Sequence, residues 1–111
     1  MLQTFKNAFS GLWWAIKSER NMKIHFVAIV VVCFSGFYFK IAQSEWAALV
    51  ICIGLVISTE LLNTAIEKMM DLMHPESSPK VKVIKDVAAG AVLFASISTV
   101  IVAILVFHKY I

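Results

Sequence analysis

The chain has 111 residues, of which 60% are hydrophobic, and a formal net charge of +3. A soluble domain this short keeps much of its surface in water and has too small an interior for so many apolar side chains. The apolar residues also come in long runs, which predicts that a membrane is their solvent. We therefore expect one small all-α membrane domain over residues 1–111, and no nucleic-acid partner, because the location of the basic residues has another explanation.

Two cysteines, Cys33 and Cys52, both lie in apolar runs. There they are expected to be small hydrophobic side chains and not a disulfide or a metal-binding pair. No cleavable signal peptide is expected, because the chain start is amphipathic and no small-residue cleavage site follows it.

Residues 2–19 have the apolar period of an amphipathic helix. Apolar side chains recur there at steps of three and four, and Trp13 and Trp14 suit the headgroup level of a bilayer. The segment is predicted to lie on the membrane surface, with simple anchoring as its minimal role.

Three apolar segments are predicted to cross the membrane. The first, 24–39, is short, but its flanks and some bilayer thinning make a span workable. The second, 44–73, begins near Ser44 as a plausible N-cap and covers roughly 45 Å, so its last turns should extend beyond the ~30 Å hydrocarbon core. The third, 83–107, follows a loop rich in proline and serine, and its first half is rich in small residues that permit close helix contact.

The basic residues predict the orientation of these spans. With three spans, the N-terminus and the loop before residue 83 share a side, and that side holds most of the lysines and arginines. The other side holds only Lys40 and Lys109. The positive-inside rule then places the N-terminus in the cytoplasm, with the protein in the inner (plasma) membrane.

The second span carries a polar and acidic face in its C-terminal half. Its members fall within roughly a 100° arc of the helix; they are Glu60, Asn63, Thr64, Glu67 and Asp71. A carboxylate deep in a membrane helix costs ~2.5–3.5 kcal/mol on insertion scales, so such residues usually serve a function and face a protein interior. Polar contact between helices is the other interpretation.

The spacing of the carboxylates limits what they can do together. Glu60 and Glu67 are roughly 10 Å apart along the helix, too far to share one ion easily. Glu67 with Glu19 could hold Mg²⁺ between phosphates, and the deeper, partly desolvated Glu60 could act as a base. Lys85 is the natural phosphate-facing cation. Because the chain has neither a P-loop nor a kinase-type glycine-rich loop, these residues alone indicate only a cytosol-facing acidic site. His25, at the mouth of the first span, is expected to make an interfacial hydrogen bond.

Three sequence blocks add a resemblance. They are E-L-L-N-T-A-I-E-x-x-x-D from Glu60, K-D-V-A-A-G-A from Lys85, and S-E-R-N-M-K-I-H ending at His25. Together they closely resemble the bacterial diacylglycerol kinase / undecaprenol kinase family over essentially the whole chain. The resemblance implies a homotrimer of three-span subunits with an amphipathic N-terminal helix, ATP and Mg²⁺ as reactants, and sites built between subunits.

The resemblance also implies residue roles and a reaction. By position, Glu60 resembles the catalytic base, and Glu19 and Glu67 resemble the metal-holding carboxylates. The other matching active-site positions, nucleotide-facing or supporting, are Asn63, Asp71, Glu76, Lys85 and Asp86. The expected activity is ATP- and Mg²⁺-dependent phosphorylation of a membrane lipid alcohol at the cytoplasmic face, giving undecaprenyl phosphate or phosphatidic acid.

Two departures and two alternatives qualify that expectation. The junction E-R-N-M-K-I-H is more similar to the undecaprenol kinase branch, and Asn7 stands where relatives often carry a tyrosine that could contact the nucleotide. The chain could instead be a small transporter or proton-coupled subunit with Glu60 as the carrier, or a structural partner with polar packing. The clustering of acidic and basic groups at one face favours the lipid kinase over the transporter, and Glu19 with the Lys85–Asp86 pair has no evident use in a structural partner.

Overall fold

The computed structural model describes residues 1–111 and is entirely helical apart from short connections. Its elements are α1 (Leu2–Ser18), α2 (Arg20–Phe39), α3 (Gln43–Met73), α4 (Pro79–Phe107) and a short 3₁₀ helix, η1 (His108–Tyr110). Three helices, α2, α3 and α4, are long and apolar enough to cross a membrane. The expected all-α class, three apolar spans plus an N-terminal helix, is confirmed.

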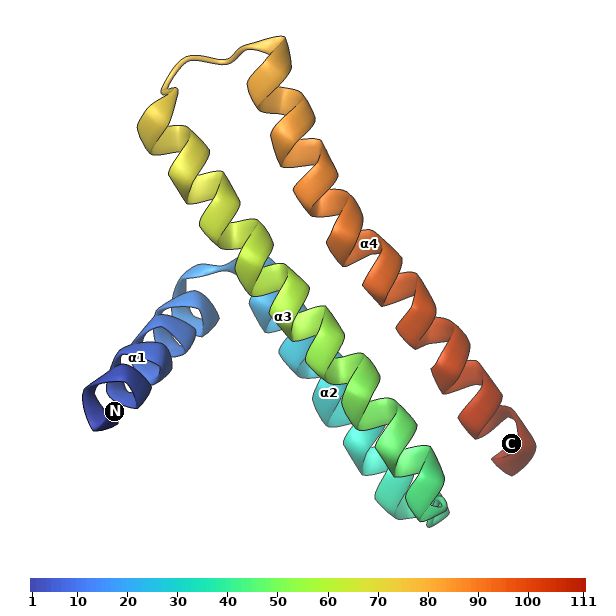
Figure 1. Cartoon of the computed structure of the whole chain (residues 1–111). Helices are drawn as coiled ribbons and strands as arrows, with labels where there is room; N and C mark the ends of the chain where they lie inside the picture. Colours follow the sequence, from blue (N-terminus) through green and yellow to red (C-terminus); the bar gives the residue numbers. More distant parts are fainter.

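The helices α3 and α4 form a long antiparallel pair, and this is the most extensive helix contact in the chain (Figure 1). Helix α2 lies along the first half of α3, while α1 turns away from the other three helices. The second half of α3 therefore extends past the start of α2, together with the first turns of α4 (Figure 1). The molecule is 50 Å along its longest axis, which exceeds the ~30 Å of a hydrocarbon core.

Very little of the chain is buried. Only 12 of 111 residues are buried, and many large apolar side chains of the three long helices are exposed. An apolar surface this extensive is not stable in water, because its burial is the main driving force of folding. Lipid or other protein chains must cover it, as expected of a membrane protein.

Helix α1 presents its apolar stripe outward. The large side chains of Leu2, Phe5 and Phe9 are more than half exposed, whereas Ala15 is buried. On its inner side α1 faces α3, where the ammonium group of Lys68 lies 5.8 Å from the centre of a Trp14 ring. This arrangement suits a helix that lies in the membrane interface and contacts the bundle near its end.

Helix α2 begins at Arg20, before the apolar segment that starts at residue 24. It is followed by a residue with a left-handed backbone conformation. Lys40 has φ 52°, the only positive φ in the chain, and the Ile41 N–H reaches back to the Gly36 carbonyl at 3.2 Å. Gly36 also has no room for a side chain, since an added Cβ would lie 2.5 Å from ring carbons of Trp46. The bare backbone at Gly36 thus lets α2 pack tightly on the start of α3.

Helix α3 starts earlier than expected, and Ser44 is not its N-cap. The cap is Ala42, whose N–H donates to Glu45 Oε1 at 2.9 Å, so the glutamate and not a serine satisfies the first turn. The hydroxyl of Tyr110 also donates to Glu45 Oε1 at 2.6 Å, and Lys109 Nζ lies 2.6 Å from Glu45 Oε2. This far-end cluster of Glu45, Lys109 and Tyr110 ties the end of the chain to the start of α3.

Helix α4 begins at Pro79, before the apolar segment that starts at residue 83. Ser78 is its N-cap and accepts a hydrogen bond from the Val81 N–H at 3.2 Å. Proline suits the first helical position because it has no N–H to leave unpaired. The helix therefore continues beyond its apolar part, which carries Lys82, Lys85 and Asp86 onto a regular helix face.

Candidate active site

The polar face of α3 is mostly turned into the protein. Glu60, Asn63 and Thr64 are only 2%, 5% and 5% exposed, although few residues of this chain are buried at all. Glu67 is half-buried and Asp71 is exposed. The face thus runs from a buried carboxylate to an exposed one along a single helix, as its period predicts.

An open space of about 280 Å³ lies beside Glu60, where α2, α3 and α4 meet. Its polar lining is contributed by Asn21, His25, Glu60, Asn63 and Ser96. Two buried oxygens of this lining, Glu60 Oε2 and Asn63 Oδ1, have no hydrogen-bond partner. A buried polar atom left without a partner costs ~1–3 kcal/mol, so native proteins rarely leave two together. Unpaired acceptors beside an open space are typical of a site that receives a donor from a ligand.

The side chain of His25 faces this space. Its Nε2 lies 3.8 Å from Glu60 Oε2, and the histidine side chain is 19% exposed. Sequence reasoning expected an interfacial hydrogen bond for His25, and the structure places it beside the buried carboxylate instead. Asn21 was also missed, although both residues belong to the sequence block that begins at Ser18.

Two further carboxylates flank the space. Asn63 Nδ2 donates to Glu67 Oε1 at 3.4 Å, and the Glu19 carboxylate lies 3.9 Å from Lys68 Nζ at the junction of α1 and α2. No three side chains of the histidine, cysteine, aspartate and glutamate types lie close enough to hold a metal on their own. One or two carboxylates are nevertheless the usual protein share of a Mg²⁺ site that also binds phosphate and water. The donor set of Glu19 and Glu67 therefore fits Mg²⁺ bound with a nucleotide.

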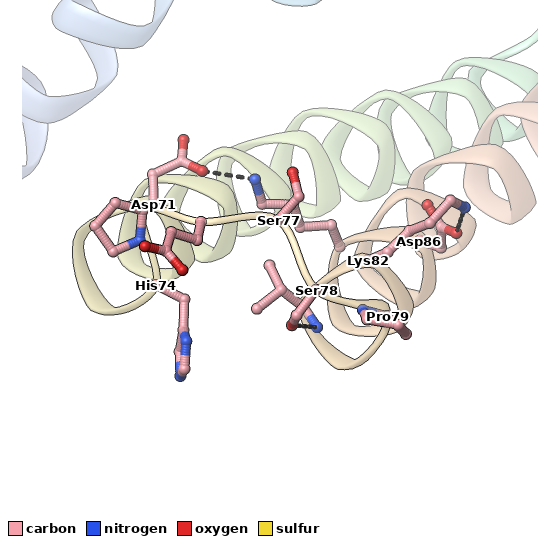
Figure 2. Close-up of a pocket in the computed structure, with 11 residues that line it drawn as sticks. Asp71, His74, Ser77, Ser78, Pro79, Lys82 and Asp86 are labelled. Atoms are coloured by element: carbon pink, nitrogen blue, oxygen red, sulfur yellow. Dashed lines mark hydrogen bonds and ion pairs between the residues drawn. The ribbon is translucent and has the colours of Figure 1, made fainter.

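A second, larger cleft lies at the end of the α3–α4 pair (Figure 2). It has a volume of about 610 Å³ and is lined almost entirely by polar side chains and prolines from the end of α3, the connecting loop and the start of α4. Two ion pairs cross or border it: Lys85 Nζ lies 2.6 Å from Asp71 Oδ1, and Lys82 Nζ lies 2.5 Å from Asp86 Oδ2. Glu76 in the loop also lines the cleft.

The structure thus divides the expected site residues into two groups. The inner group, beside the buried space, contains Glu60, Asn63 and Glu67. The outer group, in the end cleft, contains Asp71, Glu76, Lys85 and Asp86. Glu67, in the inner group, and Asp71, in the outer group, are one helical turn apart on α3. Their separation along the helix axis is roughly 6 Å. The contact of Glu19 with Lys68 places the Glu19 side chain near this part of α3.

Comparison with known proteins identifies the family of this chain. Residues 6–107 match the family described as prokaryotic diacylglycerol kinase. The chain is 37% identical over 105 residues to the undecaprenol kinase of Bacillus subtilis (strain 168), covering 95% of this chain and 85% of the relative. It is 38% identical over 103 residues to the diacylglycerol kinase of Synechocystis sp., covering 92% of this chain and 59% of that relative. The all-helical chain with its buried carboxylate on α3 therefore belongs to the prokaryotic diacylglycerol kinase family of membrane lipid kinases.

Proposed function

We propose that this protein transfers the γ-phosphate of ATP to the hydroxyl of a membrane lipid, with Mg²⁺, at the cytoplasmic face. The observation that carries the proposal is Glu60, a buried carboxylate with an unpaired oxygen beside a space open to ligands. The named activities of the relatives support the reaction type. Undecaprenol is slightly favoured over diacylglycerol as the acceptor, because the junction after Glu19 is more similar to the undecaprenol kinase branch.

Glu60 is assigned as the base. The Glu60 carboxylate, buried beside the space between α2, α3 and α4, can accept a hydrogen bond from a lipid hydroxyl that enters this space. A carboxylate in a poorly solvated site is a better base than one in water. In phosphoryl transfer the base orients the hydroxyl and takes its proton late, so a correctly placed acceptor matters more than base strength.

Glu19 and Glu67 are assigned to Mg²⁺. Glu67 accepts a hydrogen bond from Asn63, and Glu19 lies 3.9 Å from the ammonium group of Lys68, the residue that follows Glu67. These two carboxylates would hold the metal, and its charge would stabilise the negative charge of the phosphates during transfer. Mg²⁺ needs few protein ligands in such sites, which fits two carboxylates on separate helices.

The end cleft is assigned to the nucleotide. Lys85 is the cation that would contact phosphate, and Asp71 holds it in place until the nucleotide arrives. Asp86 and Glu76 also line this cleft, and Asn63, which belongs to the inner group, completes the nucleotide-facing or supporting set. A cleft of about 610 Å³ lies within the 300–1,000 Å³ typical of small-molecule sites.

The active assembly is proposed to be a homotrimer with its N-terminus in the cytoplasm. One chain leaves much of its apolar helix surface uncovered, as expected of a subunit that packs against other chains in the membrane. Association in the membrane would bring carboxylates of neighbouring chains together. The orientation rests on the concentration of lysine and arginine at the end that carries the cleft.

The decisive experiment is a phosphorylation assay with purified protein in lipid nanodiscs. Radiolabelled ATP and Mg²⁺ are supplied with undecaprenol, diacylglycerol or a long-chain primary alcohol, and the lipid fraction is analysed. We expect label in a lipid product, most rapidly with undecaprenol. Label in no lipid, from a preparation that is folded by circular dichroism, would refute the proposed function. Faster labelling of diacylglycerol would keep the function and reverse the acceptor preference.

A further inference from the structure

His25 lies beside the assigned base, Glu60, but the proposed function gives it no role. Its Nε2 is 3.8 Å from Glu60 Oε2, and that oxygen has no hydrogen-bond partner in the chain. His25 is also on a different helix from Glu60, so the contact results from the packing of α2 on α3 and not from local sequence. We propose that His25 is a positioning residue, which donates its Nε2–H to Glu60 Oε2 and fixes the direction of the carboxylate.

The position of His25 between two spaces supports this role. His25 and Ser96 line both the polar space beside Glu60 and a second, apolar space of about 140 Å³ between α2, α3 and α4. The apolar space is lined mainly by aliphatic residues such as Val32, Ile53 and Val56. A lipid alcohol with its chain in the apolar part would bring its hydroxyl past His25 to Glu60. The imidazole thus stands where the acceptor hydroxyl must meet the base.

The chemistry of the pair explains how His25 would act. Without a donor to Oε2, the orientation of the Glu60 carboxylate depends on packing and on the neighbouring Asn21 side chain, and each wrong orientation lowers the fraction of productive complexes. A neutral imidazole with the proton on Nε2 donates to Oε2 and leaves Oε1 for the acceptor hydroxyl. The separation of 3.8 Å is slightly longer than a hydrogen bond, so a small side-chain rotation on acceptor binding would close it. Because His25 acts through Glu60, its loss should reduce kcat while the KM for ATP stays unchanged.

Glutamine and asparagine provide a matched pair of substitutions. The amide nitrogen of glutamine reaches about as far as the imidazole Nε2, whereas that of asparagine reaches only as far as Nδ1. We expect His25→Gln to keep kcat within about threefold of wild type and His25→Asn to lower it roughly 10- to 100-fold, the usual range for losing a hydrogen bond to a charged group. His108→Gln, at the far end of α4, is the control, and its kcat should equal that of wild type.

The positioning role of His25 rests on the proposed function. A second measurement distinguishes failure of the positioning role from failure of the proposed function. The chain has three histidines, so ¹⁵N spectra of histidine-labelled protein in nanodiscs can be assigned by substitution. Glu60→Gln should shift the Nε2 resonance of His25 and leave those of His74 and His108 in place. An unshifted His25 resonance, or equal kcat for the glutamine and asparagine variants, would overturn the positioning role. Absence of lipid phosphorylation in the wild type, with the resonance shift present, would refute the lipid kinase function and leave the His25–Glu60 contact established.

Discussion

Replacing Glu60 by glutamine should separate catalysis from stability. The side chain is 2% exposed and carries an unpaired Oε2, and the substitution keeps its volume and one of its acceptors. It removes the negative charge and one acceptor oxygen, and with them the ability to take a proton. General-base catalysis contributes about 10²- to 10⁴-fold, so we expect kcat to fall at least roughly 100-fold, equivalent to about 2.7 kcal/mol in activation free energy.

The same substitution should not destabilise the fold. A buried polar atom without a partner costs about 1–3 kcal/mol, and a buried charge costs more than a neutral amide. The free energy of unfolding of Glu60→Gln is therefore expected to equal or exceed that of wild type. Loss of activity with unchanged or higher stability is characteristic of a residue retained for function.

The assay is lipid phosphorylation at saturating ATP and acceptor, with nucleotide binding and thermal unfolding measured on the same nanodisc preparation. Glu45→Gln is the matched control, because it makes the same chemical change in the far-end cluster. That variant should unfold at a lower temperature and keep its turnover per folded molecule. Near-wild-type turnover by Glu60→Gln would show that Glu60 is a packing residue and that the proposed mechanism is wrong.

The remaining predictions concern the metal, the assembly and the packing of α2. Glu67→Gln should raise the Mg²⁺ concentration needed for half-maximal activity and leave the oligomer intact; unchanged turnover at limiting Mg²⁺ would remove Glu67 from the site. Mixing inactive Glu60→Gln subunits with inactive Glu19→Gln subunits should restore part of the activity if the two residues act from different chains, and confirmed mixed oligomers without rescue would argue for sites within single subunits. Gly36→Ala should destabilise the protein by about 1–3 kcal/mol in chemical unfolding, because the new Cβ would lie 2.5 Å from indole carbons. Gly54→Ala, with nothing within 4 Å of its Cβ, is the control and should be neutral or slightly stabilising.

The helices and the polar face follow from local patterns in the sequence. Long apolar runs predict membrane spans from composition alone, and the period of the polar residues on α3 depends only on helix geometry. The burial of Glu60 and Asn63 follows in the same way, because a polar face in an apolar helix must turn inward.

Contacts between helices could not be predicted from the sequence. The distance from His25 to Glu60 depends on the rotation of α2 about its axis and on its shift along α3, and a single sequence records neither. The salt bridge of Lys85 with Asp71 likewise depends on the path of the loop between α3 and α4. The cap of α3 was misplaced at Ser44 because a glutamate three residues beyond Ala42 satisfied the first turn instead.

The far-end cluster has a mechanical consequence for the α3–α4 pair. Lys109 and Tyr110 fasten the end of the chain to Glu45, whereas the opposite ends of the two helices are joined by an exposed loop and by the single ion pair of Lys85 with Asp71. A pair of rods fixed at one end and linked loosely at the other can pivot about the fixed end. Over the length of α4, a pivot of about 5° displaces the free end by roughly 4 Å. A slight change of helix angle at the fastened end would therefore widen or narrow the cleft that contains Asp71 and Lys85.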